Sequence, residues 1–235
     1  MIVYAIIPSR SGSKRFKNKN IAILNKKYLF SYTINFAKKL KFVKKIIFTS
    51  DSQDYLDKAS KFENVLLHKR SLFASRDNSM EEHILKDLKK FFVNNKIKIP
   101  DAILWLRPTH PLRCLNSFNK VYSIFNQNNK TSVLVVHKQD SRLFKVKGKY
   151  IYPVNNNLKN RSMIRGQDCE PFYSIFSGEL FKFPKKINKN FLGNKKLFVE
   201  TTKYTNFDID NYYDLKILEN LINSNKKFYK KYLHD

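Results

Sequence analysis

Residues 3–20 have the sequence VYAIIPSRSGSKRFKNKN, in which an apolar run leads directly into a basic loop of small residues. A continuous apolar run of this kind is typical of a strand that is covered on both faces of a sheet. Residues 45–50, 102–106 and 132–136 form three further runs of the same character. The four runs together predict the centre of one buried, mainly parallel sheet.

Apolar residues at helical spacing occur between and after these predicted strands. Four segments show the pattern, and they are marked by Leu29, Tyr32, Phe36 and Leu40, by Met80, Ile84, Leu88 and Phe91, by Leu115, Phe118, Tyr122 and Phe125, and by Leu215, Leu218, Leu221 and Ile222. Each segment predicts a helix with one apolar face. Strands that alternate with helices predict an α/β fold in which helices flank a mainly parallel central sheet.

The composition is that of a globular chain with a large positive charge. Hydrophobic residues make up 42% of the 235 residues, and the formal net charge is +27. The charge has two interpretations, a basic surface that binds nucleic acid or a general bias toward lysine. Lysine is spread along the whole chain and arginine is scarce, which favours the bias. We therefore do not expect a nucleic-acid partner.

The length of the chain predicts one domain, residues 1–235. The low cysteine content predicts a protein of the reducing cytoplasm. No apolar stretch approaches the ~18 residues that span a membrane. The apolar N-terminus lacks a basic leader and runs straight into Pro8, as expected for a first strand rather than a signal peptide. The two cysteines, Cys114 and Cys169, form neither a metal-binding spacing nor a disulfide framework.

The basic loop after the first strand combines small residues with cations. Ser11 and Gly12 allow the backbone to approach a ligand closely, so that N–H groups can point at phosphate oxygens. Arg10, Lys14 and Lys19 can neutralise a polyphosphate. The loop matches neither of the common glycine-rich phosphate motifs, and a solvated basic loop explains these residues about equally well.

A second unusual loop, residues 107–113, has the sequence RPTHPLR and follows the predicted strand at 102–106. Two prolines stiffen it, and Arg107 and Arg113 flank it with fork-shaped donors that suit an anionic ligand. The alternative is a proline-stiffened turn before the next helix. His110 by itself is more often a packed residue than a catalyst.

Two aspartates stand just before the last predicted helix, in the sequence FDIDN at residues 207–211. In an extended chain, residues two apart point to the same side, so Asp208 and Asp210 should face one spot, as a Mg²⁺ site requires. The alternative is that Asp210 or Asn211 only caps the helix. In parallel sheets ligands bind at the carboxyl ends of the strands, which is where the two loops are expected.

Together these segments resemble the acylneuraminate cytidylyltransferases, the family of CMP-sialic acid synthetases. The resemblance extends from residue 1 to about residue 222, and it rests on IPSRSGSK at 7–14, KNI at 19–21, TSD at 49–51, RPTHPLR at 107–113 and DID at 208–210. It implies a Rossmann-like nucleotidyltransferase fold. It also implies transfer of CMP from CTP to the anomeric hydroxyl of a sialic acid-like nonulosonic acid, with release of pyrophosphate.

The resemblance implies roles for individual residues. The nucleotide-binding set is Arg10, Ser11, Gly12, Lys14, Lys19, Asn20 and Ser79. The catalytic set is Arg10, Lys14, Asp208 and Asp210, and the two aspartates would also hold Mg²⁺ as cofactor. The family is dimeric, and its excursion from the sheet crosses to the partner subunit. Residues 138–172 are polar with apolar patches around Phe144 and Ile151. We therefore expect this segment to form the interface of a homodimer.

The sequence departs from the family in the part that should bind the sugar. Arg107 stands where the family often has glutamine, and the arginine that usually precedes an Asn-Gly pair is missing from YSIFSG at 173–178. Arg165 does match a family arginine, although it could be a surface residue of the dimer arm. A buried sugar carboxylate needs a paired cation, so Arg107 and Arg165 are the predicted sugar-binding residues. We expect an acidic nonulosonate other than plain N-acetylneuraminate.

Two alternative functions stay open at this point. The first is the same chemistry on ketodeoxyoctonate or another acidic sugar. The second, from a different class, is a non-catalytic basic protein that binds nucleic acid, although the aspartate pair argues against it.

Overall fold

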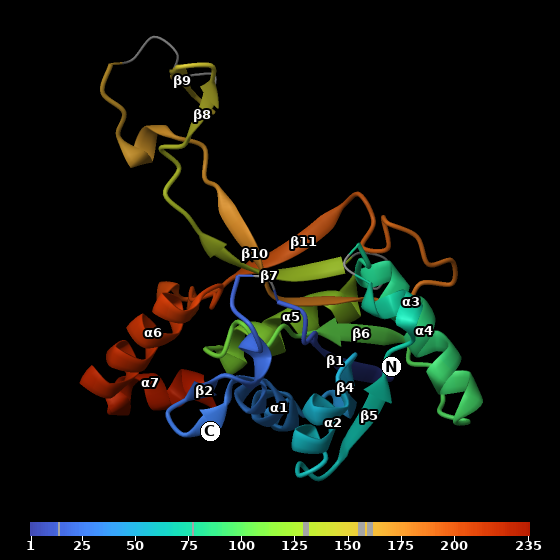
Figure 1. The fold of residues 1–235 in the computed structure, drawn as a ribbon. Coiled ribbons are helices and arrows are strands. Elements are labelled where there is room, and N and C mark those ends of the chain that lie inside the picture. The colour runs from blue at the N-terminus through green and yellow to red at the C-terminus, as the bar shows by residue number, and fades with distance from the viewer. Residues whose placement is uncertain (14, 77, 129–131, 155–157, 159–161) are drawn as a thin grey trace.

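The computed structural model describes residues 1–13, 15–76, 78–128, 132–154, 158 and 162–235. Its centre is a seven-stranded sheet with the order β11-β7-β10-β6-β1-β4-β5 (Figure 1). The strands are β1 Val3–Ser9, β4 Val43–Ser50, β5 Val65–Lys69, β6 Ala102–Trp105, β7 Ser132–Lys138, β10 Tyr173–Lys182 and β11 Lys196–Glu200. Strand β10 is antiparallel to both β6 and β7, and the other neighbouring pairs are parallel. The predicted mainly parallel α/β fold is confirmed.

Helices cover both faces of this sheet. One face packs against α1 (Leu29–Lys39), α2 (Gln53–Ala59) and α5 (Leu115–Gln127), and the other packs against α4 (Glu81–Asn94), which the short helix α3 (Leu72–Ser75) accompanies. Strand β1 shows why its sequence is continuously apolar. Ala5 and Ile7 belong to the first core cluster, whereas Tyr4 and Ile6 belong to the second, because successive side chains of a strand point to opposite faces.

A third apolar cluster joins the end of the chain to the start of α1. Helices α6 (Tyr212–Ser224) and α7 (Lys226–Leu233) pack here beside a two-stranded ribbon of β2 (Ile23–Leu24) and β3 (Lys27–Tyr28). The cluster includes Ile209, which anchors the segment between the two aspartates. Within the described residues, no helix combines the length and the apolar character needed to cross a membrane.

Between β7 and β10 the chain leaves the sheet as an arm. The N–H of Gln139 donates to the carbonyl of Phe172 at 2.9 Å and closes the base of the arm. Beyond this base, β8 (Phe144–Lys147) and β9 (Tyr150–Pro153) pair with each other in a separate antiparallel sheet that projects from the body (Figure 1). The two apolar patches predicted within residues 138–172 are these two strands.

Strand β10 was not among the predicted strands, and its position depends on Gly178. A Cβ atom at Gly178 would lie 2.5 Å from the ring of Phe118 on α5, well inside van der Waals contact. The register of β10 against β7 also shifts between Ser174 and Gly178. Only a glycine allows the strand to pass this close to the helix.

Candidate active site

A cavity of about 450 Å³ opens at the carboxyl edge of the sheet. Its walls come from the loops after β1, β5 and β6, from the start of α4 and from the segment before α6. The predicted site residues that line it are Arg10, Lys19, Asn20, Ser79, Arg107, Asp208 and Asp210. The fold thus brings together residues from both halves of the sequence, as binding at the carboxyl ends of parallel strands requires.

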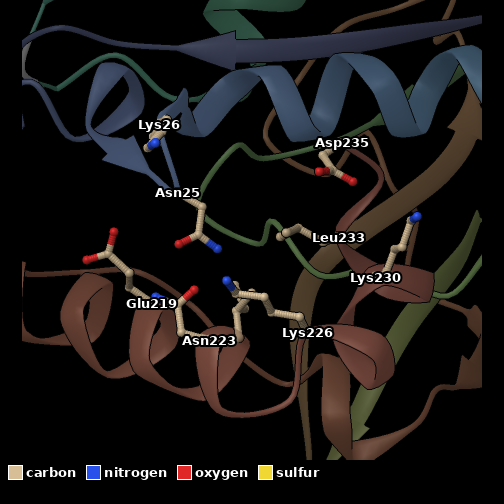
Figure 2. A pocket seen from close by; sticks show the side chains of 9 residues that line it. Asn25, Lys26, Glu219, Asn223, Lys226, Lys230, Leu233 and Asp235 are labelled. Atoms are coloured by element: carbon tan, nitrogen blue, oxygen red, sulfur yellow. The ribbon is translucent and has the colours of Figure 1, made fainter.

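A larger cavity, of about 580 Å³, lies elsewhere, between the turn that joins β2 to β3 and the helices α6 and α7. Figure 2 shows its lining, in which Glu219 and Asp235 stand at opposite ends. The basic groups around it include Lys226 and Lys230, and it contains none of the predicted site residues. The candidate active site is therefore the smaller of these two cavities, because the predicted site residues line that one.

Side-chain hydrogen bonds fix the start of the basic loop, at Arg10 and Ser11. The amide of Asn20, a buried side chain, donates to the carbonyl of Arg10 at 3.0 Å. The N–H and hydroxyl of Ser11 donate to the carboxylate of Asp51, at 2.9 and 2.8 Å. Because Asp51 directly follows β4, this contact ties the loop to the neighbouring strand and keeps Arg10 at the cavity.

Gly12 of the basic loop lies outside the described cavity lining. Gly12 is exposed, and its missing Cβ would lie 3.4 Å from Nε of Arg10, so the guanidinium lies close to the glycine backbone. Neither Ser11 nor Gly12 is part of the described cavity lining. Lys14 lies outside the described residues. The cations that the structure does place at the cavity from this loop are Arg10 and Lys19.

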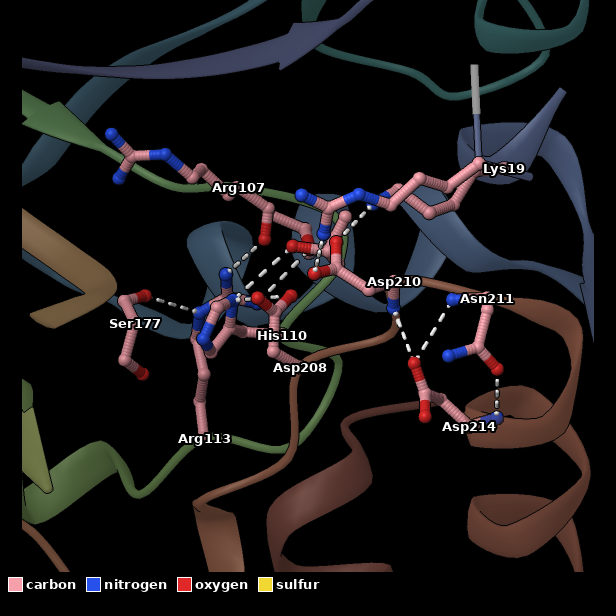
Figure 3. Close-up of polar contacts among 12 residues, drawn as sticks. Lys19, Arg107, His110, Arg113, Ser177, Asp208, Asp210, Asn211 and Asp214 are labelled. Atoms are coloured by element: carbon pink, nitrogen blue, oxygen red, sulfur yellow. Dashed lines mark hydrogen bonds and ion pairs between the residues drawn. The ribbon is translucent and has the colours of Figure 1, made fainter. Parts of the chain in front are cut away.

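The segment before α6 directs both aspartates into the cavity. Ile209, between them, is buried, and its N–H donates to the carbonyl of Thr109 at 2.9 Å. Asp208 and Asp210 lie on the opposite side of the extended chain and both line the cavity (Figure 3). The helix cap is a separate residue: the side chain of Asn211 accepts from the N–H of Asp214 at 3.0 Å.

The two carboxylates have different surroundings. Asp210 accepts from Lys19 and from Arg15, each at 2.9 Å, and the hydrogen bond from Lys19 contributes most to lowering the pKa of Asp210. Burial raises the pKa of Asp208, the charge of Asp210 adds to the rise, and a hydrogen bond from Thr109 opposes it. The pKa of Asp210 is therefore shifted down and that of Asp208 is shifted up from the ordinary value of an aspartate.

The donor set fits Mg²⁺. Hard carboxylate oxygens from two residues face a cavity whose other wall carries cations for a polyphosphate. Across the described ranges, no group of three or more histidine, cysteine, aspartate or glutamate side chains is placed to hold a metal ion. Phosphate oxygens and water would therefore complete the coordination at Asp208 and Asp210, which is how Mg²⁺ usually binds in phosphoryl-transfer sites.

Arg107 enters the cavity from the loop after β6, but carboxylates of the protein bind its guanidinium. One nitrogen donates to both oxygens of Glu179, at 2.7 and 2.8 Å, and another donates to Glu81 at 3.1 Å. Glu179 is buried on β10, and burial raises its pKa while the charge of Arg107 opposes the rise. The positive charge of Arg107 is thus compensated within the protein.

Arg113 does not reach the cavity, although the sequence suggested an anion-binding role for both arginines of the loop. Its side chain is fully buried and donates to the carbonyls of Ser177 and Arg107 and to the hydroxyl of Thr33, at 3.2, 2.6 and 3.0 Å. Burial lowers the pKa of Arg113 to about 9. Arg113 thus holds the loop in place and lies outside the described cavity lining.

Sequence reasoning missed Arg70, a buried arginine that also lines the cavity. Its guanidinium donates to the hydroxyl and the carbonyl of Thr49, at 3.2 and 3.1 Å, and so it is fixed in orientation. Burial lowers the pKa of Arg70 to about 10. The only available signal was its position after β5, a strand that the apolar pattern did not predict.

Arg165 is not brought to the cavity of its own chain. It is exposed on the arm, just before the 3-10 helix Gly166–Asp168, and the arm projects away from the body (Figure 1). The described cavity lining does not include it. The predicted sugar-binding residue Arg165 therefore lies apart from Arg107 and the rest of the predicted site within this chain.

The fold is a mainly parallel α/β sheet whose carboxyl edge carries a basic loop and an aspartate pair. Solved structures agree on the fold. A CMP:2-keto-3-deoxy-manno-octonic acid synthetase aligns with a TM-score of 0.66 and 11% identity, over 95% of this chain and 99% of that one. A 4-diphosphocytidyl-2C-methyl-D-erythritol synthase aligns with a TM-score of 0.66 and 10% identity, over 94% and 99%.

The cytidylyltransferase family model matches residues 4–230, and the chain therefore belongs to the cytidylyltransferase family. The flagellin modification protein B of Campylobacter coli is 27% identical over 94% of each chain. The CMP-N,N'-diacetyllegionaminic acid synthase of Legionella pneumophila is 30% identical over 57% of this chain and 58% of its own length. The N-acylneuraminate cytidylyltransferase of Escherichia coli is 33% identical over 47% of this chain and 25% of its own length. The predicted enzyme class and family resemblance are confirmed.

Proposed function

We propose that this enzyme transfers CMP from CTP to the anomeric hydroxyl of a sialic acid-like nonulosonic acid and releases pyrophosphate. The main support for this proposal is that Arg10, Lys19, Asp208 and Asp210 line one cavity. The two cations can bind a triphosphate there, and the two carboxylates can bind a metal ion beside it. Relatives whose names specify neuraminate and legionaminate substrates support an acidic nine-carbon sugar as acceptor.

We propose that cationic side chains at the cavity bind the triphosphate of CTP. Arg10 and Lys19 would neutralise the phosphates and stabilise the charge that builds on pyrophosphate as it leaves. Arg70, held by Thr49, adds a guanidinium of fixed orientation to the nucleotide side. Asn20 keeps the loop closed, and Ser79 lines the same cavity. We propose Lys14 as a further phosphate ligand from its position in the loop.

The chemical step forms a bond between the anomeric oxygen and the α-phosphorus. The bond from that phosphorus to the bridging oxygen breaks, pyrophosphate takes the electron pair, and the hydroxyl proton leaves to solvent. Bound Mg²⁺ at Asp208 and Asp210 would neutralise phosphate charge and lower the pKa of the attacking hydroxyl. The protein's own contribution is to position the two substrates and to balance charge. Because the reaction consumes CTP, we place it in the cytoplasm.

We propose that the arm makes the enzyme a homodimer and carries Arg165 to the partner's cavity. The arm exposes apolar side chains, among them Val146 and Ile151, which are 74% and 64% exposed. A second copy that covers them would remove this surface from water. Arg165 would then pair with the carboxylate of a sugar bound to the other subunit, since its own cavity lies out of reach.

Pyrophosphate release from CTP tests the proposed function. The purified protein is mixed with Mg²⁺, CTP and a panel of 2-keto sugar acids that includes N-acetylneuraminate, legionaminate-type and pseudaminate-type sugars, and ketodeoxyoctonate. We expect release with a nine-carbon acidic sugar and weak use of N-acetylneuraminate. Reactions without sugar, or with UTP in place of CTP, are the controls. A protein that releases no pyrophosphate with any member of the panel would refute the proposal.

A further inference from the structure

A charged cluster lines the same cavity as the cations proposed to bind the phosphates. Arg107, Glu179 and Glu81 form it, with nitrogen-to-oxygen distances of 2.7 to 3.1 Å. The three residues come from the loop after β6, from β10 and from the start of α4. Side chains from three separate elements in mutual contact form a preorganised wall, because each restricts the orientation of the next.

The cluster is electrically balanced. Arg113 lies against it, since its guanidinium donates to the carbonyl of Arg107 at 2.6 Å. Within these four residues, two arginines are matched by the two carboxylates Glu179 and Glu81, while the charge of Glu81 also acts on Arg70 and that of Arg107 on Asp208. A sugar carboxylate that approached Arg107 would meet Glu81 beside it, and the like charges would repel. We therefore expect the acidic group of the acceptor to pair with a cation outside this cluster.

The order of the strands gives the cluster its place in the cavity. Arg107 follows β6, and Glu179 belongs to β10, which is the next strand in the order β10-β6-β1-β4-β5. Arg10 follows β1, and Arg70 follows β5, on the far side of β1. With the nucleotide near Arg10 and Arg70, Arg107 and Glu179 fall on the side that is left for the acceptor sugar, and Glu81 lies between the two sides, since its charge also acts on Arg70.

Within the cluster, Glu81 is the carboxylate with access to a ligand. Its side chain is 34% exposed and lines the cavity, whereas that of Glu179 is 4% exposed. An ionised carboxylate only accepts hydrogen bonds, and Arg107 satisfies one oxygen of Glu81. The group that Glu81 offers to the cavity is a fixed, negatively charged acceptor.

We propose that Glu81, positioned by Arg107 and Glu179, determines acceptor specificity by accepting a hydrogen bond from a hydroxyl or acylamino N–H of the sugar. The same charge keeps the sugar's carboxylate away from this wall, and so it orients the acceptor. This inference rests on the proposed function and names the residue that selects among its acceptors. A site built to bind a donor strongly disfavours an analogue that lacks it, because its polar group is then left unpaired.

The test compares nonulosonates in which one hydroxyl or acylamino group at a time is replaced by hydrogen. With the wild-type enzyme, we expect at least one such replacement to lower kcat/KM by about tenfold or more. In Glu81→Ala, the loss at that position should shrink to within about twofold, while the KM for CTP stays within about twofold of wild type. Glu81→Gln, which keeps the shape and one acceptor oxygen, should retain an intermediate preference and guards against a folding defect.

Glu82→Gln is the matched control, because Glu82 occupies the same helix start but is not part of the described cavity lining. It should keep the wild-type preference among the analogues. If both Glu81 variants keep that preference while pyrophosphate release continues, the inference is overturned and the proposed function stands. If the wild-type enzyme uses no 2-keto sugar acid at all, both are overturned.

Discussion

Nζ of Lys19 lies 2.9 Å from Oδ1 of Asp210, although the two residues are 191 positions apart in the sequence. This ion pair joins the basic loop after β1 to the aspartate segment before α6 across the cavity (Figure 3). The side chain of Lys19 is 15% exposed and that of Asp210 is 45% exposed. The ion pair therefore holds a cation suited to phosphate and a carboxylate suited to metal side by side at the cavity.

Replacing Asp210 with asparagine should reduce kcat by roughly a hundredfold or more, the range seen when one strong electrostatic contact to a transition state is lost. The neutral amide cannot match Lys19 and Mg²⁺ with charge, while the fold should persist because the side chain is half exposed. Steady-state pyrophosphate release at low and high Mg²⁺ measures the effect. Asp54→Asn, on the exposed side of α2, is the control. Full activity of Asp210→Asn at low Mg²⁺ would show that the metal assignment is wrong.

Replacing Lys19 with alanine should weaken CTP binding by about tenfold or more and leave the KM for the sugar largely unchanged. The ammonium group lost is a partly buried one that faces the cavity, where a phosphate contact is poorly screened by solvent. Calorimetry of CTP binding tests this. Lys17→Ala removes an exposed lysine from the same loop as a control. Unchanged CTP affinity together with unchanged turnover in Lys19→Ala would contradict the assignment.

Replacing Val146 with aspartate should convert the proposed dimer to a monomer, since it places a charge on the exposed apolar surface of β8. Light scattering of wild type and variant gives the masses directly. Lys147→Asp, which adds an acidic residue to the same strand without removing an apolar side chain, is the matched control. A wild-type protein that scatters as a stable, active monomer would rule out the arm as a dimer interface.

Mixing two variants of low activity shows whether Arg165 contributes to the cavity of the partner subunit. Arg165→Ala and Asp210→Asn should each have low activity as homodimers. A mixed dimer has one cavity with an intact Asp210 that faces an intact arm from the other chain, so activity should return when the two are refolded together. If Arg165 served its own chain, no cavity of the mixed dimer would be complete, and activity would stay low.

Replacing Gly178 with alanine should destabilise the fold by about 1–3 kcal/mol, the usual cost of overpacking a filled core. The new methyl group would lie 2.5 Å from a ring atom of Phe118 and 3.3 Å from Leu106. Urea denaturation measures the loss. Gly166→Ala is the control, because its Cβ would have no described atom within 4 Å and its φ is not positive. Equal stability of the two variants would show that β10 does not need the close approach.

His137 should make the protein less stable as the pH falls from about 6.5 toward 4. Burial lowers the pKa of His137 to about 4, below its ordinary value of 6.5, and neither ring nitrogen has a hydrogen-bond partner among the described residues. The unfolded chain therefore binds a proton that the folded state resists, so stability is lost over this window. Between pH 7 and pH 5, wild type should lose about 2 kcal/mol more than His137→Leu. Urea denaturation at both pH values measures this, and equal losses would contradict it.

The four apolar runs of the sequence determined four of the seven strands of the sheet. Strands β1, β4, β6 and β7 coincide with them because each is buried on both faces, and burial of that kind is visible in consecutive residues. The helices α1, α4, α5 and α6 follow for the same reason, since one apolar stripe at helical spacing is a local signal. The residues of the aspartate pair and of the basic loop were likewise recognisable from short stretches of chain.

The tertiary structure decided what no short stretch contains. Strand β10 carries polar residues and Gly178, and it becomes a central strand only because β6 and β7 pair with it from both sides. Arg107 could be predicted as a cavity residue, but its partner Glu179 is 72 positions away, so its compensated charge depends on the strand order. Arg165 matched the family by sequence, yet the arm carries it away from its own cavity. Local periodicity encodes burial, whereas the pairing of charges depends on which strands become neighbours.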